Sequence, residues 1–198
     1  ALNKLLSAYG EVYVAVLGIY YKLQTFLYMP SNGIVQGIRP IISSNYGAGR
    51  MDRMWKTIRY SLLAVAGIIL IGTVLCWSIP EGLLRLFDDD VQMLSIGGQA
   101  LPWISLGFVV SSVAVIVCGA MEALGRGLSS LVLSLLRQFV LTVPIAWGLM
   151  HMLDVFGVWI ALPLSEWMAG LFAFFLLFRL WNETKGIEEA SDCEKKWL

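Results

Sequence analysis

The hydrophobic pattern of this chain is a series of long apolar stretches separated by short polar or glycine-containing turns. A helix that crosses a lipid bilayer needs about 20 predominantly apolar residues. Five stretches are long enough, at roughly residues 11–43, 55–79, 92–121, 128–152 and 156–181. We interpret residues 1–9 as the end of a preceding helix and residues 182–198 as a polar, irregular tail. The pattern predicts an all-α integral membrane protein, built as a bundle of about five transmembrane helices.

The first apolar stretch, residues 10–53, is unusual because polar side chains interrupt it at membrane depth. Lys22, Gln24 and Gln36 lie inside it. It is longer than a straight crossing of about 30 Å requires, so we expect a kink near Pro30 and a protruding end. A helix in a soluble core has no need for this length or for these polar interruptions. We interpret the stretch as a membrane helix that lines a polar cavity, around which the bundle is built.

Helical spacing places a mixed group of side chains on one face of this stretch. The group is polar at both ends, with an aromatic ring and a thioether in the middle, and its members are Lys22, Phe26, Met29, Gly33 and Gln36. Aromatic faces attract cations and methionine adapts to varied shapes, so this face suits a cavity for apolar cations. For Phe26 and Met29 taken singly, ordinary helix packing explains the pattern equally well. Gln24 points elsewhere, where it is placed to hydrogen-bond across helices.

The composition argues against several classes of protein. The chain is 58% hydrophobic and 14% charged, whereas soluble domains are about 45–50% apolar and about 25% charged. The 14 basic and 14 acidic residues balance, so the net charge gives no indication of a nucleic acid or acidic partner. We expect the lipid bilayer and no nucleic acid as a partner. The cysteines are scattered, there is one histidine, and neither a phosphate-binding loop nor a catalytic pair is present. We therefore expect no metal, no organic cofactor, no ATP-driven pump and no enzyme.

Basic residues are distributed unevenly between the two sides of the predicted bundle. Nine lie on one side and two on the other. The nine are Arg50, Arg53, Lys56, Arg59, Arg126, Arg179, Lys185, Lys195 and Lys196, and the two are Lys4 and Arg85. Short cytoplasmic loops are enriched in lysine and arginine. The distribution predicts a multi-pass protein of the cell inner (plasma) membrane with a cytoplasmic C-terminus.

Three charged side chains remain deep inside the predicted spans: Lys22, Arg137 and Glu166. A charged group at the centre of a bilayer costs about 2.5–3.5 kcal/mol even on insertion scales, so such groups usually face protein or water and pair. Either Arg137 or Lys22 is able to neutralise Glu166. One interpretation is a polar cavity in which Glu166 changes protonation or contacts a cationic substrate. The other is a static ion pair that holds helices together.

Three groups of short motifs follow one another along the chain. The first is Gly18–Phe26 (GIYYKLQTF), Met29-Pro30, Gly33, Gln36-Gly37, Pro40 and Asn45–Gly49 (NYGAG). The second is Gly119–Arg126 (GAMEALGR) with Arg137-Gln138, and the third is Gly157-Val158-Trp159 with Pro163 and Glu166. In order and spacing, over most of residues 3–181, they resemble the C-terminal lobe of the multidrug and toxic-compound extrusion (MATE) family, and its bacterial branch in particular.

The resemblance implies a protein of about twelve helices in two lobes, which rock around a mid-membrane cavity and export cationic drugs in exchange for H+ or Na+. In that register the five stretches are the eighth to twelfth helices, and the N-terminal lobe is missing from this sequence. Coupling carboxylates of the family often lie on the first or seventh helix and cannot be carried over. Glu122 stands where many relatives have glutamine, and we do not expect it to be a coupling site.

We therefore expect a secondary-active multidrug antiporter for small organic cations, with H+ or Na+ as the coupling ion. The candidate residues of the substrate and cation cavity are Lys22, Gln24, Met29, Gln36, Arg137 and Glu166. The nearest alternative is a flippase for lipid-linked or polysaccharide precursors, which three cationic side chains on one cavity, Lys22, Arg39 and Arg137, would favour. A non-transporting membrane scaffold would be favoured if Lys22, Arg137 and Glu166 were all held in dry helix contacts.

Overall fold

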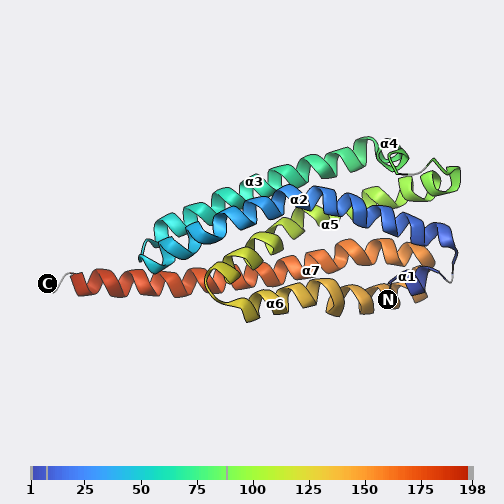
Figure 1. Ribbon diagram of the computed structural model, residues 1–198. Helices are drawn as coiled ribbons and strands as arrows, with labels where there is room; N and C mark the ends of the chain where they lie inside the picture. Colours follow the sequence, from blue (N-terminus) through green and yellow to red (C-terminus); the bar gives the residue numbers. More distant parts are fainter. Residues whose placement is uncertain (1, 8, 88, 196–198) are drawn as a thin grey trace.

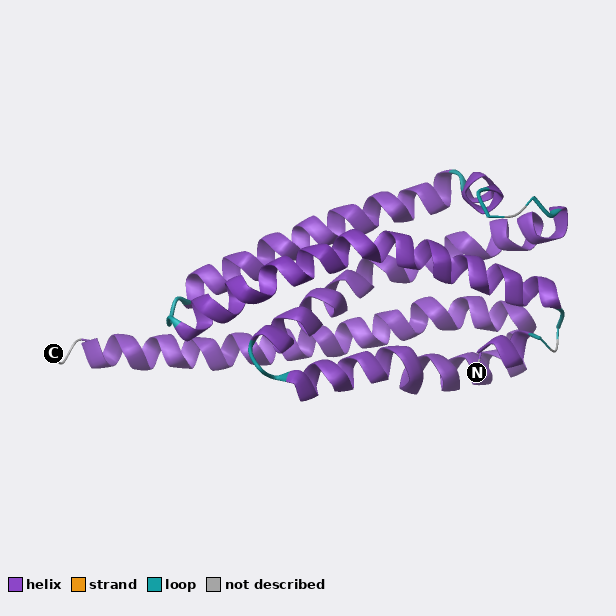
Figure 2. Cartoon of the chain, viewed as in Figure 1, coloured by secondary structure: helices purple, strands orange, loops and turns teal. Residues whose placement is uncertain are grey.

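The computed structural model describes residues 2–7, 9–87 and 89–195, which form helices joined by short turns (Figures 1 and 2). In chain order the elements are α1 (Leu2–Leu6), α2 (Glu11–Gly47), α3 (Met51–Ser78), α4 (Pro80–Arg85), α5 (Val91–Ala123), α6 (Gly127–Leu135), the π-helical segment η1 (Leu136–Leu141) and α7 (Thr142–Lys195). Three described stretches are long and apolar enough to cross a membrane, namely Met51–Ser78, Val91–Ala123 and Gly127–Gly186. The predicted fold class, an all-α membrane bundle, is confirmed.

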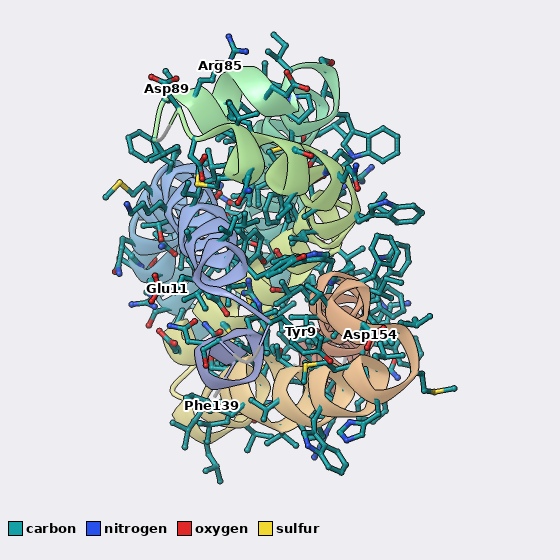
Figure 3. The ribbon with its side chains drawn as sticks, turned by 90° about the vertical axis from the view of Figure 1, so that its right-hand side faces the viewer. Tyr9, Glu11, Arg85, Asp89, Phe139 and Asp154 are labelled. Carbon is teal, nitrogen blue, oxygen red and sulfur yellow. The ribbon has the colours of Figure 1, made fainter. Side chains whose placement is uncertain are left out.

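The last of these stretches is a hairpin, and its two legs correspond to the predicted helices at 128–152 and 156–181. The first leg consists of α6, η1 and the beginning of α7. The chain reverses at Asp154, whose φ of 51° and ψ of −140° are not helical. Figure 1 shows the two legs running in opposite directions, and α7 packs against η1. At the reversal, the hydroxyl of Tyr9 donates a hydrogen bond to Oδ1 of Asp154 at 3.4 Å (Figure 3).

The structure corrects the prediction of an irregular tail over residues 182–198. α7 continues through most of these polar residues and ends at Lys195, and residues 196–198 lie outside the described part. The segment is rich in glutamate and lysine, which are good helix formers, so polarity alone does not end the helix. α2 likewise runs as one helix through both of its prolines, Pro30 and Pro40.

α5 is the central helix of the bundle. It contacts α2, α3, α4, α6 and α7, and it is the most buried of the three candidate spans. Ile104, Phe108 and Ile116 are its largest fully buried side chains. α3 lies at the periphery and exposes a row of apolar side chains, Leu63, Leu70, Ile71 and Val74. This surface is suited to contact with lipid.

The hairpin at Asp154 requires a residue without a side chain at position 157. A β-carbon at Gly157 would lie 2.3 Å from the main-chain oxygen of Leu149 on the opposite leg. Main-chain atoms cannot move aside as a side chain can, so we expect Gly157→Ala to cost about 1–3 kcal/mol of stability or more. The measurement is the melting temperature of the detergent-solubilised gene product. The matched control is Gly148→Ala, where no atom lies within 4 Å; equal melting temperatures for the two variants would contradict this packing.

Candidate functional site

An ion pair between Arg137 of η1 and Glu166 of α7 lies in the interior of the bundle. Nε of Arg137 donates to Oε1 of Glu166 at 3.0 Å and lies 2.7 Å from Oε2. The side chains are only 15% and 10% exposed, respectively. Of the two cations that the sequence offers to neutralise Glu166, the structure pairs it with Arg137. Oε2 is buried and receives no aligned hydrogen bond despite its short distance to Nε.

Arg137 is positioned by an irregular turn of helix. η1 is a π-helical segment, and such segments occur frequently at functional sites because they change the register of the helix. The hydroxyl of Thr142 donates to the main-chain oxygen of Arg137 at 2.6 Å and lies 3.0 Å from Oγ of Ser165 on the opposite leg. Ser165 in turn donates to the main-chain oxygen of Leu162 at 2.8 Å. These polar contacts hold the two legs together beside the ion pair.

A chain of hydrogen bonds leads from the ion pair to α2 and α5. Nη2 of Arg137 donates to the hydroxyl oxygen of Tyr28 at 3.2 Å, and its guanidinium carbon lies 5.3 Å from the centre of the Tyr28 ring. The Tyr28 hydroxyl also contacts Oγ of Ser111. Because Ser111 donates its own proton to the main-chain oxygen of Phe108 at 2.9 Å, Tyr28 is the donor to Ser111. The ion pair is therefore the start of a directional network across four elements, η1, α7, α2 and α5.

Aromatic packing and a close helix approach surround this network. The rings of Tyr20 and Phe108 are stacked, with centres 5.8 Å apart and planes 7° apart, and Tyr28 meets Phe108 edge-on at 6.3 Å. On the other side, a β-carbon at Gly107 would lie 2.9 Å from Cα of Pro163 and 3.1 Å from Cβ of Glu166. Gly107 thus allows α5 to approach α7 closely at the point where the side chain of Glu166 is attached.

Sequence reasoning missed Tyr28 and Ser111. A signal for Tyr28 was present, since Tyr20, Gln24 and Tyr28 are spaced i, i+4 and i+8 and share one face of a helix. Gln24, a predicted site residue, is half-buried and hydrogen-bonds to Tyr28. No comparable spacing singles out Ser111 among the serines of α5.

The other predicted residues, Lys22, Met29 and Gln36, lie on an exposed face of α2 and do not meet the ion pair. Phe26 and Met29 on this face are 72% and 64% exposed. Nζ of Lys22 lies 5.8 Å from the ring centre of Phe87, in the turn before α5. An open pocket of about 400 Å³ lies here, lined by Tyr21, Lys22, Thr25, Phe26, Met29 and Phe87. The six predicted residues therefore form two sets on different sides of α2.

A second ion pair joins α2 to α5 near the opposite end of α2. Arg39 pairs with Glu122 and also donates from Nη1 to Oε1 of Gln36 at 3.2 Å. Oε1 of Glu122 accepts from Ser130 of α6 at 2.8 Å. Both charged side chains are about one-third exposed, so we interpret this contact as a structural ion pair that links the two helices.

Among the described residues, no three His, Cys, Asp or Glu side chains are grouped as metal ligands would be.

Comparisons with known proteins identify relatives of this chain. Multidrug export protein MepA of Staphylococcus haemolyticus (strain JCSC1435) is 22% identical over 181 residues, covering 91% of this chain and 40% of that protein. MepA of Staphylococcus aureus (strain MRSA252) is 22% identical over 179 residues, covering 90% and 39%. The chain thus spans about 40% of the length of these curated relatives.

Solved structures share the fold. A multidrug resistance MATE family transporter of the MOP superfamily in an outward-facing conformation superposes with a TM-score of 0.86 at 20% identity, over 93% of this chain and 42% of that one. The bent form of the Vibrio cholerae MATE transporter VcmN gives a TM-score of 0.85 at 19% identity, over 91% and 41%. A protein-family model described as MatE matches residues 1–148. Because that match covers 148 of 198 residues, the chain belongs to the MatE family of multidrug efflux transporters.

Proposed function

We propose that the chain forms the C-terminal lobe of a secondary-active multidrug antiporter, which exports small organic cations in exchange for H+ or Na+. One observation carries the proposal: the face of α2 with Lys22, Phe26 and Met29 is open, whereas Arg39 and Arg137 are paired with carboxylates. A second lobe that covers this face would complete a mid-membrane cavity with an aromatic and thioether wall. The relatives named multidrug export proteins support this class of substrate.

In this proposal, Glu166 is the site in this chain where the coupling cation binds. Its Oε2 is buried without an aligned hydrogen bond, which leaves a lone pair for a proton or Na+. Neutralising Glu166 would release Arg137, which retains the Tyr28 hydroxyl and ring as partners. Because breaking a buried ion pair is costly, the two states differ enough to bias the packing of η1 against α2 and α5. In the transport cycle, binding of the coupling cation at Glu166 would then be linked to movement of the lobe.

The alternatives are less well supported. A flippase for phosphate-bearing precursors would need a strongly cationic cavity, but Arg39 and Arg137 each face a glutamate. A scaffold would hold all of its membrane charges in dry contacts, but Lys22 is exposed. We further propose that the protein is a multi-pass protein of the inner (plasma) membrane with its C-terminus in the cytoplasm, as the bias of basic residues indicates.

The first test is a mutant cycle on the ion pair in the complete gene product. Glu166→Gln leaves the Arg137 charge buried and unpaired, at a cost of about 3–5 kcal/mol, so membrane abundance should fall. The double variant Arg137→Gln, Glu166→Gln removes both charges and should restore abundance. Ethidium efflux driven by an imposed H+ or Na+ gradient, normalised to abundance, should remain lost in both variants. Restored efflux in the double variant would make the pair a static contact and would remove Glu166 from coupling.

The second test concerns the open face of α2. Phe26→Ala removes the exposed ring beside Lys22, and a cation–π contact is worth about 0.5–2 kcal/mol. We therefore expect the KM for efflux of an aromatic cation such as ethidium to rise about twofold to thirtyfold. The matched control is Phe174→Ala on α7, where the ring is 62% exposed but lies away from the pocket of Lys22. An equal change of KM in the two variants would contradict a substrate contact at Phe26.

A further inference from the structure

An apolar cavity lies beside the open face of α2, between α2, α3 and the segment that includes α4. Its volume is about 230 Å³. Its lining is entirely apolar apart from a cysteine: Leu23, Phe26, Leu27, Gly72, Leu75, Cys76, Leu83, Leu86 and Phe87. None of these side chains belongs to the ion-pair network of Arg137, so the cavity is separate from the proposed coupling site.

The apolar cavity adjoins the pocket that contains Lys22. Phe26 and Phe87 line both, so the two spaces are neighbours. Among the described residues, no carboxylate lies within ion-pair distance of Lys22, whose ammonium faces the Phe87 ring at 5.8 Å. Lys22, which has no anionic partner among the described residues, thus lies at one end of the apolar cavity. We call the apolar cavity together with the Lys22 pocket the slot.

The entrance of the slot lies on the outer surface of the bundle. Phe26, Leu75 and Leu86 line it and are exposed. Leu75 continues the row of exposed apolar side chains on α3 that is suited to lipid contact. Leu75 therefore offers an apolar chain a route into the cavity from the hydrocarbon of the bilayer.

We propose that this slot binds an anionic membrane phospholipid, with one acyl chain in the apolar cavity and the phosphate group at Lys22. Lysine carries an apolar stem and a strongly charged end, which matches the boundary between acyl chain and headgroup. The ammonium of Lys22 favours an anionic headgroup at this end of the cavity. The proposal goes beyond transport: it describes a resident lipid at the edge of the proposed substrate cavity, and it does not require the chain to transport anything.

The test is photolabelling of the complete gene product in nanodiscs, with no ion gradient applied. The probes are phosphatidylglycerol and phosphatidylcholine that carry the same diazirine on the acyl chain, and labelled peptides are mapped by mass spectrometry. Phosphatidylglycerol should label residues 72–87 about fivefold more than phosphatidylcholine, the factor that corresponds to about 1 kcal/mol for one lysine near an anionic lipid. This comparison uses the wild-type protein and depends on no variant.

Two variants and two controls locate the site. Lys22→Gln should abolish the preference for phosphatidylglycerol, and Leu75→Trp, which fills the slot, should reduce labelling by both lipids. The controls are Arg85→Gln, a basic residue outside the slot, and Leu70→Trp on the exposed face of α3; both should retain wild-type labelling. Equal labelling by the two lipids, or an unchanged preference in Lys22→Gln, would overturn the proposal. Because no transport is measured, failure of the antiport proposal leaves this result unaffected.

Discussion

A charged side chain in the interior of a membrane bundle must be neutralised by a close partner, and this requirement organises the centre of the protein. Glu166 and Arg137 satisfy it for each other at 2.7–3.0 Å. Three features surround the pair: the π-helical register of η1, the glycine at 107 that admits α7, and the Tyr28 hydroxyl that accepts a hydrogen bond from Nη2 of Arg137. Buried polar networks are stable only when their members are satisfied, so each of these features depends on the others.

α2 has two functional faces. One carries Tyr20, Gln24 and Tyr28 into the bundle, where the two aromatic rings pack on Phe108 and the Tyr28 hydroxyl accepts a hydrogen bond from Arg137. The other carries Lys22, Phe26 and Met29 and is left open. A movement of Arg137 would act on the buried face, and the same rigid helix would carry that movement to the open face. Under the proposed function, this arrangement would connect the coupling site at Glu166 to a substrate wall that it does not touch.

Sequence reasoning predicted the long helices because the thickness of a bilayer sets their length, and it predicted that Glu166 pairs with a cation because unpaired charge at depth is costly. It did not choose between Lys22 and Arg137, since that choice depends on helix rotation. It placed Lys22, Met29 and Gln36 together with Glu166 because helical spacing orders one helix but does not say which face meets its neighbours. The predicted break between residues 152 and 156 contains the non-helical Asp154, whereas η1 was not predicted, because a π-helical register has no marker in the hydrophobic pattern.

The charges of this chain also indicate which charge the opposing lobe must bring to the proposed cavity. Glu122 and Glu166, the carboxylates beside α2, are each neutralised by an arginine, and the open face itself carries only the positive Lys22. An organic cation bound against Phe26 and Met29 would therefore meet aromatic and thioether surface, and none of the described residues that line this pocket is a carboxylate. Under the proposed function, the opposing lobe must provide the counter-charge, and Lys22 then restricts where on α2 a cation can bind. Under the two proposals, Lys22 would mark the boundary on α2 between the wall for organic cations and the site of the phospholipid.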